Sequence, residues 1–219
     1  MCLKKGSFGL EVARSGRLWN PNKNKKGKIM NFQIAESEIL AVAGLCMNDF
    51  KDEKKDILLI NADNLELFKM LLKFGANIYA LNANVERENL AGVAFYDLAI
   101  NLKITQFDAI IDLKSKGVEH YKKLLKPNGI LIVDLDAMER AKIADKRADF
   151  NVLMPFRLQF GGCEKNYLFA SSKFHPIADF SLQKLDMMDG LQYCNARIYE
   201  AAFALPNYVR WKLKGVIRN

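Results

Sequence analysis

Short, unbroken apolar runs recur through the middle of this chain, and stretches with helical periodicity separate them. An apolar run without polar alternation is typical of a strand that is buried on both faces, as in a parallel sheet covered by helices. The runs predict strands at residues 57–60, 78–81, 109–111 and 130–133. Two further apolar segments, at 152–156 and 167–171, predict late strands that close one edge of the sheet.

The predicted helices fall between these runs. Apolar residues recur at helical spacing from residue 35 to 47 and again after Leu65, where Gly75 is placed to end the helix. Residues 116–126 predict another helix, which ends before a proline, and the last helix is expected around 197–203. This alternation predicts an α/β fold, with a Rossmann-like (methyltransferase-like), mostly parallel sheet flanked by helices.

The segment 1–34 has a different pattern. Residues 8–13 suit a short strand, and turn-forming residues dominate 19–27. We therefore expect a short N-terminal β appendage or loop at 1–34, followed by one Rossmann-like domain at 35–219.

Composition and charge exclude several classes of protein. The longest nearly unbroken apolar stretch, residues 39–47, is far shorter than the roughly 20 residues of a membrane span, so we expect no membrane segment and a cytoplasmic location. The net charge of +8 favours anionic partners, but much of it lies in basic runs at 23–28 and 210–218, which are typical of solvated tails. We expect no nucleic-acid partner, because no nucleic-acid-binding module is recognisable.

The cysteines and histidines do not have the spacing of metal ligands. The cysteines are Cys2, Cys46, Cys163 and Cys194, and the histidines are His120 and His175. No cysteine pair of the C-x-x-C type occurs, and neither histidine has a second ligand nearby in sequence. We therefore expect free thiols and no metal.

Polar residues follow the predicted strands. Ligands of open α/β sheets bind beyond the carboxyl ends of the strands, which selects residues 61–66, 82–86, 96–98 and 112–117. The polar residues there include Asn61, Asp63, Asn64, Asn82, Asn84, Asp97 and Asp112. The first of these segments lacks glycine, which a dinucleotide site needs for close approach of the backbone. NAD and FAD are therefore disfavoured, and a standard S-adenosylmethionine site is disfavoured less strongly.

The C-terminal part carries a specific motif. Residues 193–206 read Tyr-Cys-Asn-Ala-Arg-Ile-Tyr-Glu-Ala-Ala-Phe-Ala-Leu-Pro, which resembles the closing motif of spermidine synthases, Tyr-Tyr-Asn followed by Ile-His-x-Ala-Ala-Phe-x-Leu-Pro. Residues 35–41 are similar to the family's Tyr-His-Glu-Met-Leu-Ala helix, and residues 125–131 to its Leu-Lys-Pro-Gly-Gly-Ile-Leu turn. The resemblance spans about residues 32–209. The chain resembles a divergent bacterial branch of the spermidine synthase (polyamine aminopropyltransferase) family, and its N-terminal region is shortened relative to the family.

The resemblance implies transfer of the aminopropyl group of decarboxylated S-adenosylmethionine to putrescine, which gives spermidine and methylthioadenosine. Decarboxylated S-adenosylmethionine is then a co-substrate and no cofactor is needed. The family also implies a homodimer. Because both substrates are cationic and the attacking amine must lose a proton, carboxylates are expected at the site.

For ligand binding, the resemblance assigns residues at matching positions. The acid of the family's glycine-rich loop, which holds the aminopropyl amine, falls on Asn64, with Asp63 one place earlier. The glutamate that binds the ribose hydroxyls falls on Asn82, and the aspartate that binds adenine is kept as Asp97. Asp63 and Asn64 are equally well explained as helix caps.

For catalysis, the match is less direct. The family's catalytic aspartate falls on Leu113, so Asp112, one place earlier, is the predicted base, although a one-residue shift along a strand turns a side chain to the opposite face. The tyrosine and histidine of the early helix fall on Glu36 and Ser37, and the histidine of the closing motif falls on Tyr199. In this interpretation Glu36 is a replacement acid. The alternative interpretation of Asp112 is an ordinary loop residue without a catalytic role.

Three alternatives stay open at the level of sequence. The replaced acids fit a weak or inactive relative that keeps the fold. An S-adenosylmethionine-dependent methyltransferase shares the fold class but explains the closing motif poorly. A nucleic-acid-binding protein is supported by net charge alone.

Overall fold

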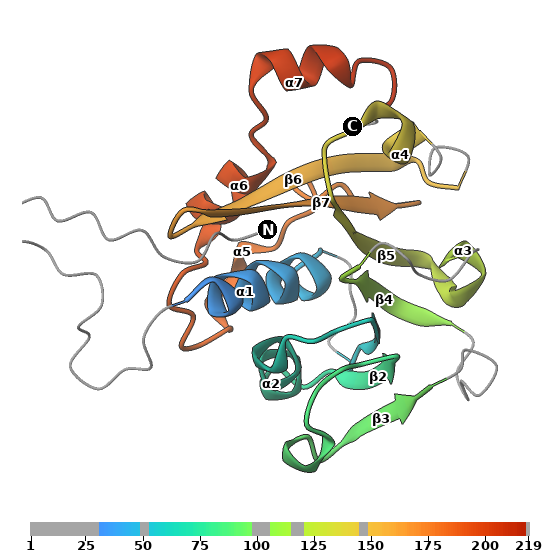
Figure 1. The fold of residues 1–219 in the computed structure, drawn as a ribbon, viewed down its shortest axis with the longest axis vertical. Helices are drawn as coiled ribbons and strands as arrows, with labels where there is room; N and C mark the ends of the chain where they lie inside the picture. The colour runs from blue at the N-terminus through green and yellow to red at the C-terminus, as the bar shows by residue number, and fades with distance from the viewer. Residues whose placement is uncertain (1–30, 49–52, 98–105, 115–120, 145–148, 218–219) are drawn as a thin grey trace, which may run out of the picture.

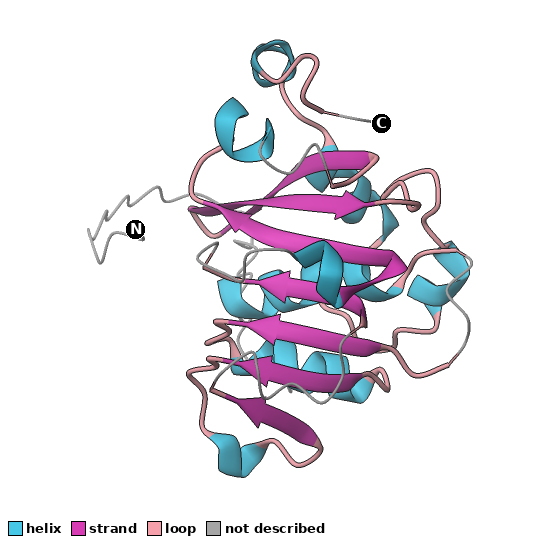
Figure 2. Ribbon diagram, turned by 90° about the vertical axis from the view of Figure 1, so that its right-hand side faces the viewer, coloured by secondary structure: helices cyan, strands magenta, loops and turns pink. Residues whose placement is uncertain are grey.

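The computed structural model describes residues 31–48, 53–97, 106–114, 121–144 and 149–217. A twisted sheet crosses the molecule, and helices lie against both of its faces (Figure 1; Figure 2). Its strands are β1 (Asp56–Ile60), β2 (Asn77–Leu81), β3 (Val93–Tyr96), β4 (Phe107–Asp112), β5 (Leu125–Leu135), β6 (Val152–Phe160) and β7 (Cys163–Ser171). The helices are α1 (Phe32–Leu45), α2 (Leu65–Lys73), the short 3-10 turn η1 (Arg87–Asn89), α3 (Tyr121–Leu124), α4 (Arg140–Ala144), α5 (Leu182–Asp186), α6 (Ala196–Phe203) and α7 (Asn207–Lys212).

The predicted fold class is confirmed. The seven strands form one sheet in the order β3-β2-β1-β4-β5-β7-β6, with all of the predicted strands inside it. The first five in this order are parallel, whereas β7 is antiparallel to both β5 and β6, so the late strands close one edge as predicted. The carboxyl ends of β1, β2, β3, β4 and β5 therefore share one edge of the sheet.

The two faces of the sheet carry separate apolar clusters. We call the first the α1 face: Ile57 and Leu59 of β1 point there and pack with residues of α1 and α2. We call the second the α3 face: Leu58 and Ile60 point there and pack with Tyr121 of α3 and with residues of α4 and α7. Every second residue of a strand faces the same way, so a one-residue step along a strand changes the face.

Helix α1 begins slightly earlier than residue 35. The side chain of Asn31 caps it by accepting a hydrogen bond from the backbone N–H of Ile34 at 3.0 Å. The helix is buried from Ile34 to Gly44, because the sheet and α2 enclose it. Residues 1–30, which include the predicted strand at 8–13, lie outside the described residues.

The predicted helix at 116–126 is wrong in its last part. Residues 115–120 lie outside the described residues, α3 ends at Leu124, and β5 already begins at Leu125. Pro127 is tolerated in this strand because the pairing with β4 shifts between Phe107 and Ala109, so residues beside the proline bulge out of the ladder.

The hairpin of β6 and β7 turns tightly. Gly161 and Gly162 form its loop, both with positive φ, at 59° and 80°. Two successive residues with positive φ are what a type I′ turn requires. The turn extends both strands well beyond the predicted segments and carries Lys165 and Tyr167 to the carboxyl edge of β5. No helix in these described ranges is long and apolar enough to cross a membrane.

Candidate active site

Asparagines turn the chain at the ends of β1 and β2. Asn61 and Asn82 adopt φ values of 54° and 52°, in the left-handed region where glycine is usual and asparagine is the most tolerated alternative. Their backbone N–H groups donate to Leu81 and Tyr96, at 2.9 and 3.0 Å, which continues the ladder by one step. Asparagine thus makes the turns that glycine makes in a typical nucleotide site. Its side chains occupy space beside the backbone that glycine would leave open to a ligand.

Glu36 lies at the start of α1 on the α1 face, and its carboxylate is nearly fully buried. It accepts hydrogen bonds from Asn64 Nδ2 at 2.8 Å, from Lys165 Nζ at 2.7 Å and from the Tyr167 hydroxyl. Burial, followed by Glu36, raises the pKa of Tyr167. Burial lowers the pKa of Lys165 but Glu36 raises it, and the net shift is upward, so the lysine stays charged.

Asn64 is both a cap and a partner of Glu36. Its side-chain oxygen accepts from Glu66 N at 3.1 Å at the start of α2, while its amide nitrogen bonds Glu36 and the backbone oxygen of Gln33. Ser37 is fully buried and donates back to Gln33 O at 2.7 Å, so its hydroxyl is used within α1.

Asp112 lies at the end of β4 with no exposed surface. Its carboxylate accepts from the Tyr121 hydroxyl at 2.6 Å, from Asn61 Nδ2 at 3.1 Å and from the backbone N–H of Lys114 at 3.1 Å. Burial, followed by the hydrogen bond to Asp112, raises the pKa of Tyr121. Tyr121 belongs to the α3 face, so Asp112 points away from Glu36.

Leu113, where the family's catalytic acid falls, has the opposite orientation. It is buried in the cluster of the α1 face, and its N–H donates to Ile60 O at 3.1 Å. The structure therefore separates the predicted base from the predicted amine-binding carboxylate by the thickness of the sheet. The role of base that the sequence predicts for Asp112 stays a prediction, and its burial and three hydrogen bonds oppose it.

Asp134 is a carboxylate that the sequence reasoning missed. It is half-buried near the end of β5 and is paired across the sheet with Tyr167 of β7. Burial raises its pKa to about 6, with Lys165 lowering it and Asp136, Glu36 and Asp112 raising it further. The available signal was its position: it ends the last parallel strand, where the strand-end rule also applies.

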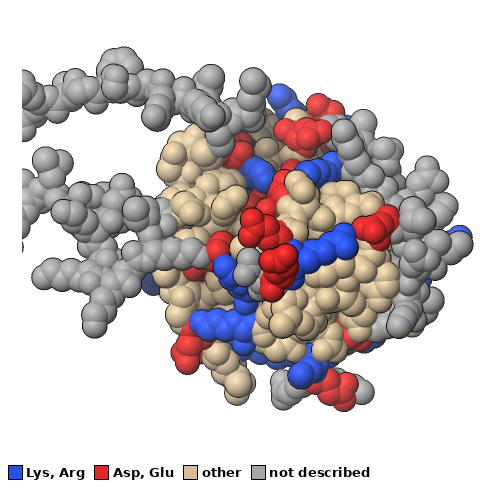
Figure 3. Space-filling model, turned by 60° about the horizontal axis from the view of Figure 1, so that its bottom comes forward, with Lys and Arg blue, Asp and Glu red and all other residues tan. Residues whose placement is uncertain are grey.

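The remaining predicted residues of this edge are exposed. Asp63 forms an ion pair with Lys114 at 3.4 Å. Asp97, directly after β3, bonds Arg87 at 2.9 Å, with 79% of its side-chain surface exposed. Asn82 is exposed too, which leaves its side chain accessible to a ligand. On the face in Figure 3, acidic and basic side chains alternate over the surface rather than gathering into a single basic patch.

Tyr199 is not at this edge. It is fully buried in α6 and stacks on Phe180 with ring centroids 4.3 Å apart, and its hydroxyl has no hydrogen-bond partner among the residues that the structure describes. The closing motif around it is structural: Asn195 caps α6 by accepting from Ile198 N at 3.0 Å. The substrate-binding role predicted for Tyr199 stays a prediction without a contact that supports it.

Glu38 holds the closing motif against α1. Its carboxylate is almost completely buried and accepts from three successive backbone N–H groups, those of Gln192, Tyr193 and Cys194, at 2.7–2.8 Å. Such a cradle of backbone donors satisfies the charge without a cation. Glu38 is therefore used in packing the two ends of the domain together.

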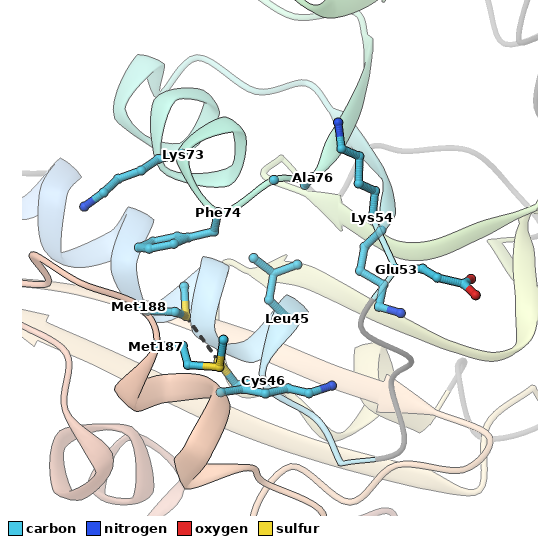
Figure 4. A pocket seen from close by; sticks show the side chains of 12 residues that line it. Leu45, Cys46, Glu53, Lys54, Lys73, Phe74, Ala76, Met187 and Met188 are labelled. Atoms are coloured by element: carbon cyan, nitrogen blue, oxygen red, sulfur yellow. Dashed lines mark hydrogen bonds between the residues drawn. The ribbon is translucent and has the colours of Figure 1, made fainter.

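A hollow of about 480 Å³ lies at the opposite end of the strands (Figure 4). Leu45, Phe74 and Met188 line it, with Lys54 and Lys73 at its rim. Cys46 also lines it and bonds Met188 Sδ at 3.2 Å, and burial raises the pKa of this thiol to about 12. Because the hollow borders the residues before β1 and β2, it is remote from the carboxyl edge, and we place the candidate active site at that edge.

No group of three or more acidic, histidine or cysteine side chains arranged to hold a metal occurs among the described residues.

Comparisons with known proteins agree with this architecture. No protein-family model matches the chain. Two curated proteins named polyamine aminopropyltransferase, from Helicobacter pylori strains HPAG1 and ATCC 700392 / 26695, are 28% and 27% identical to it. The matches cover 86% and 90% of this chain and 80% and 83% of those proteins. A crystal structure of spermidine synthase from Thermotoga maritima has a TM-score of 0.67 at 18% identity, over 82% of this chain and 74% of that one. A spermidine synthase in complex with the transition-state analogue AdoDATO has a TM-score of 0.68, with the same identity and coverage.

The chain is similar in sequence to polyamine aminopropyltransferases over most of its length, and its fold is that of the spermidine synthases. Against the spermidine synthase pattern quoted above, this chain has Leu113 in place of the catalytic acid and Glu36 in place of the tyrosine of the early helix. The two replacements share the α1 face, as does Asp134. The chain therefore carries acids on the α1 face, where Leu113 lies, but at other positions.

Proposed function

We propose that this protein is a polyamine aminopropyltransferase of the spermidine synthase type. It transfers the aminopropyl group of decarboxylated S-adenosylmethionine to putrescine and releases methylthioadenosine. The observation that carries the proposal is the match to polyamine aminopropyltransferases over 80–83% of their length. The small-molecule site at the carboxyl edge of the sheet fits the general position of ligands in such folds.

Different residues at this edge bind the nucleoside and the amines in this proposal. Asn82 and Asp97, at the ends of β2 and β3, are accessible to the ribose and the adenine of the nucleoside. Glu36 supplies buried negative charge toward the cationic amines, and Asp63 supplies exposed charge nearby. Lys165 forms an ion pair with Glu36 and offsets part of this charge. No cofactor is needed, because the sulfonium of the co-substrate is itself the activated group.

The assembly and location follow the same proposal. We infer a homodimer in the cytoplasm that acts on small molecules and has no nucleic-acid or membrane partner. Size-exclusion chromatography with light scattering distinguishes a dimer from a monomer of 24.9 kDa.

The activity is tested by incubating the full chain with decarboxylated S-adenosylmethionine and a panel of diamines. We expect methylthioadenosine and the aminopropylated amine to appear together, with putrescine among the accepted diamines. A parallel reaction with S-adenosylmethionine, followed by detection of S-adenosylhomocysteine, tests for a methyltransferase. Absence of methylthioadenosine with every diamine would contradict the proposal and favour a relative that keeps the fold without the activity.

A further inference from the structure

Strand register places Asp134 on the face of the sheet that carries Glu36. Along β5, Ile130 and Ile132 belong to the α1 face, and Leu131 and Val133 belong to the α3 face. Asp134 continues the first series, because side chains alternate along a strand. Its cross-strand partner Tyr167 also lies on the α1 face.

The pairing with the neighbouring strand β4 places Asp134 beside Leu113. In the parallel pairing of β4 and β5, Asp112 is opposite Val133, and both point to the α3 face. The next step in that register sets Asp134 beside Leu113 on the α1 face. Asp134 thus provides a carboxylate one strand away from the position where the family's acid is missing.

Asp134 also has the free carboxylate among the three buried or half-buried acids near this edge. Glu36 accepts three hydrogen bonds, from Asn64, Lys165 and Tyr167. Asp112 also accepts three, from Asn61, Lys114 and Tyr121. Asp134 accepts none from the residues that the structure describes, and it keeps some exposed surface. A carboxylate in that state is able to bond an incoming ammonium group.

We propose that Asp134 is the carboxylate that accepts the proton of the acceptor amine, a role that rests on the aminopropyl transfer proposed above. The ammonium of the diamine gives one proton to the Asp134 carboxylate and becomes a neutral amine. The nitrogen lone pair then forms a bond to the aminopropyl carbon attached to the sulfonium. The carbon–sulfur bond breaks, and its electron pair stays on sulfur, which becomes the neutral thioether of methylthioadenosine. The product is a secondary ammonium, and Asp134 returns its proton to solvent.

The electrostatics of the site suit this role. Burial is the main cause that raises the pKa of Asp134 to about 6, and Lys165 opposes the shift. A base is most effective when its pKa is near the working pH, where it is ionised and still basic enough to take a proton. The groups that surround it are Lys165 of β7, Glu36 of α1, Asp112 of β4 and the adjacent Asp136.

The test compares turnover of the full-length parent with that of Asp134→Asn, Asp134→Glu, Asp112→Asn and Asp136→Asn. Release of methylthioadenosine from decarboxylated S-adenosylmethionine is followed from about pH 5 to about pH 9, with the diamine that the parent prefers. We expect Asp134→Asn to lower kcat by about 10²–10⁴-fold and to remove the acidic limb of the pH profile. Asp134→Glu retains a carboxylate and should recover much of the rate, and Asp136→Asn is the matched control that removes one exposed charge nearby.

The outcomes separate this role from the proposed function. An active parent together with an Asp134→Asn variant that keeps the parent's kcat and pH profile overturns the role of Asp134 alone. Loss of the acidic limb in Asp112→Asn, but not in Asp134→Asn, also overturns it and assigns the base to Asp112. A parent without turnover on any diamine overturns both proposals. Circular dichroism of each variant confirms that a lost rate does not come from a lost fold.

Discussion

At the carboxyl edge of the sheet, the carboxylates on the two faces differ in burial and in hydrogen bonding. On the α3 face, Asp112 is fully buried and its oxygens are occupied by Tyr121, Asn61 and the backbone of Lys114. On the α1 face, Asp134 is half-buried, one strand away, and accepts no hydrogen bond from a described residue. The first arrangement suits a group that holds structure, and the second suits a group that exchanges protons. Nearness in sequence to a family position is therefore a weaker guide than the face of the strand.

The strongest test of this difference is the stability of an Asp112→Ala variant. The substitution leaves the Tyr121 hydroxyl and the Asn61 amide without a buried acceptor, so we expect the free energy of unfolding to fall by about 3 kcal/mol. Urea denaturation measures it. The control, Asp63→Asn, removes an exposed carboxylate and should change stability by no more than about 0.5 kcal/mol. A loss for Asp112→Ala as small as for the control would show that Asp112 does not hold the structure.

A third carboxylate at this edge extends the comparison to the nucleoside. Asp97 is exposed and bonds only Arg87 among the described residues. If it binds adenine, Asp97→Ala should weaken methylthioadenosine binding by about 1.5–3 kcal/mol, because a charge-assisted hydrogen bond is lost. Calorimetric titration measures this, with Asp136→Asn as the control. Equal affinity for variant and parent rules out the assignment.

The ion pair of Glu36 and Lys165 sharpens the description of the α1 face. Their distance is 2.7 Å, and the exposed fractions of the side chains are 4% for Glu36 and 38% for Lys165. Because solvent reaches the lysine, we expect a coupling energy of about 1–2 kcal/mol, smaller than for a fully buried pair. A double-mutant cycle with Glu36→Gln and Lys165→Met measures it by denaturation. A coupling energy near zero would mean that Asn64 and Tyr167 alone hold Glu36.

The smallest expected effect is a pH dependence of stability. The folded-state pKa of Asp134, about 6, lies above its ordinary value of 3.8. Between these two values the folded state binds more protons than the unfolded state, so this group destabilises the protein as pH rises toward 6 and above. Asp134→Asn should therefore raise the melting temperature at neutral pH and have little effect below the ordinary pKa. An equal shift at both pH values would contradict the raised pKa.

The sequence predicted the sheet well, because buried parallel strands have a simple apolar signature. Ile57 and Ile130 fall within predicted runs and lie in the sheet as expected. The helix predicted at 116–126 failed in its last part, since the bulge opposite Phe107 allows Pro127 inside a strand. A Gly-Gly pair, Gly161 and Gly162, carried a hairpin signal that would have lengthened β6 and β7.

The candidate site was harder to predict than the fold. Sequence spacing placed Asp112 one residue from the family's acid but did not determine its partners, which come from β1 and α3. Tyr199 stands where the closing motif has a histidine, yet packing against Phe180 decides its surroundings. Asp134 directly follows the predicted run at 130–133, but only the antiparallel pairing with β7 brings it near Lys165 and Glu36.

The cradle around Glu38 has a consequence for how the chain folds. Its carboxylate in α1 bonds the N–H groups of residues 192–194, which are 154–156 positions later in the chain. During synthesis, α1 leaves the ribosome long before those donors exist, so its buried charge has no protein partner until the closing segment arrives. Contacts of such large sequence separation are slow to form, because a long loop must close first. A nascent chain that stops short of residue 192 should therefore keep α1 undocked and sensitive to proteases, and docking should be a late step of folding.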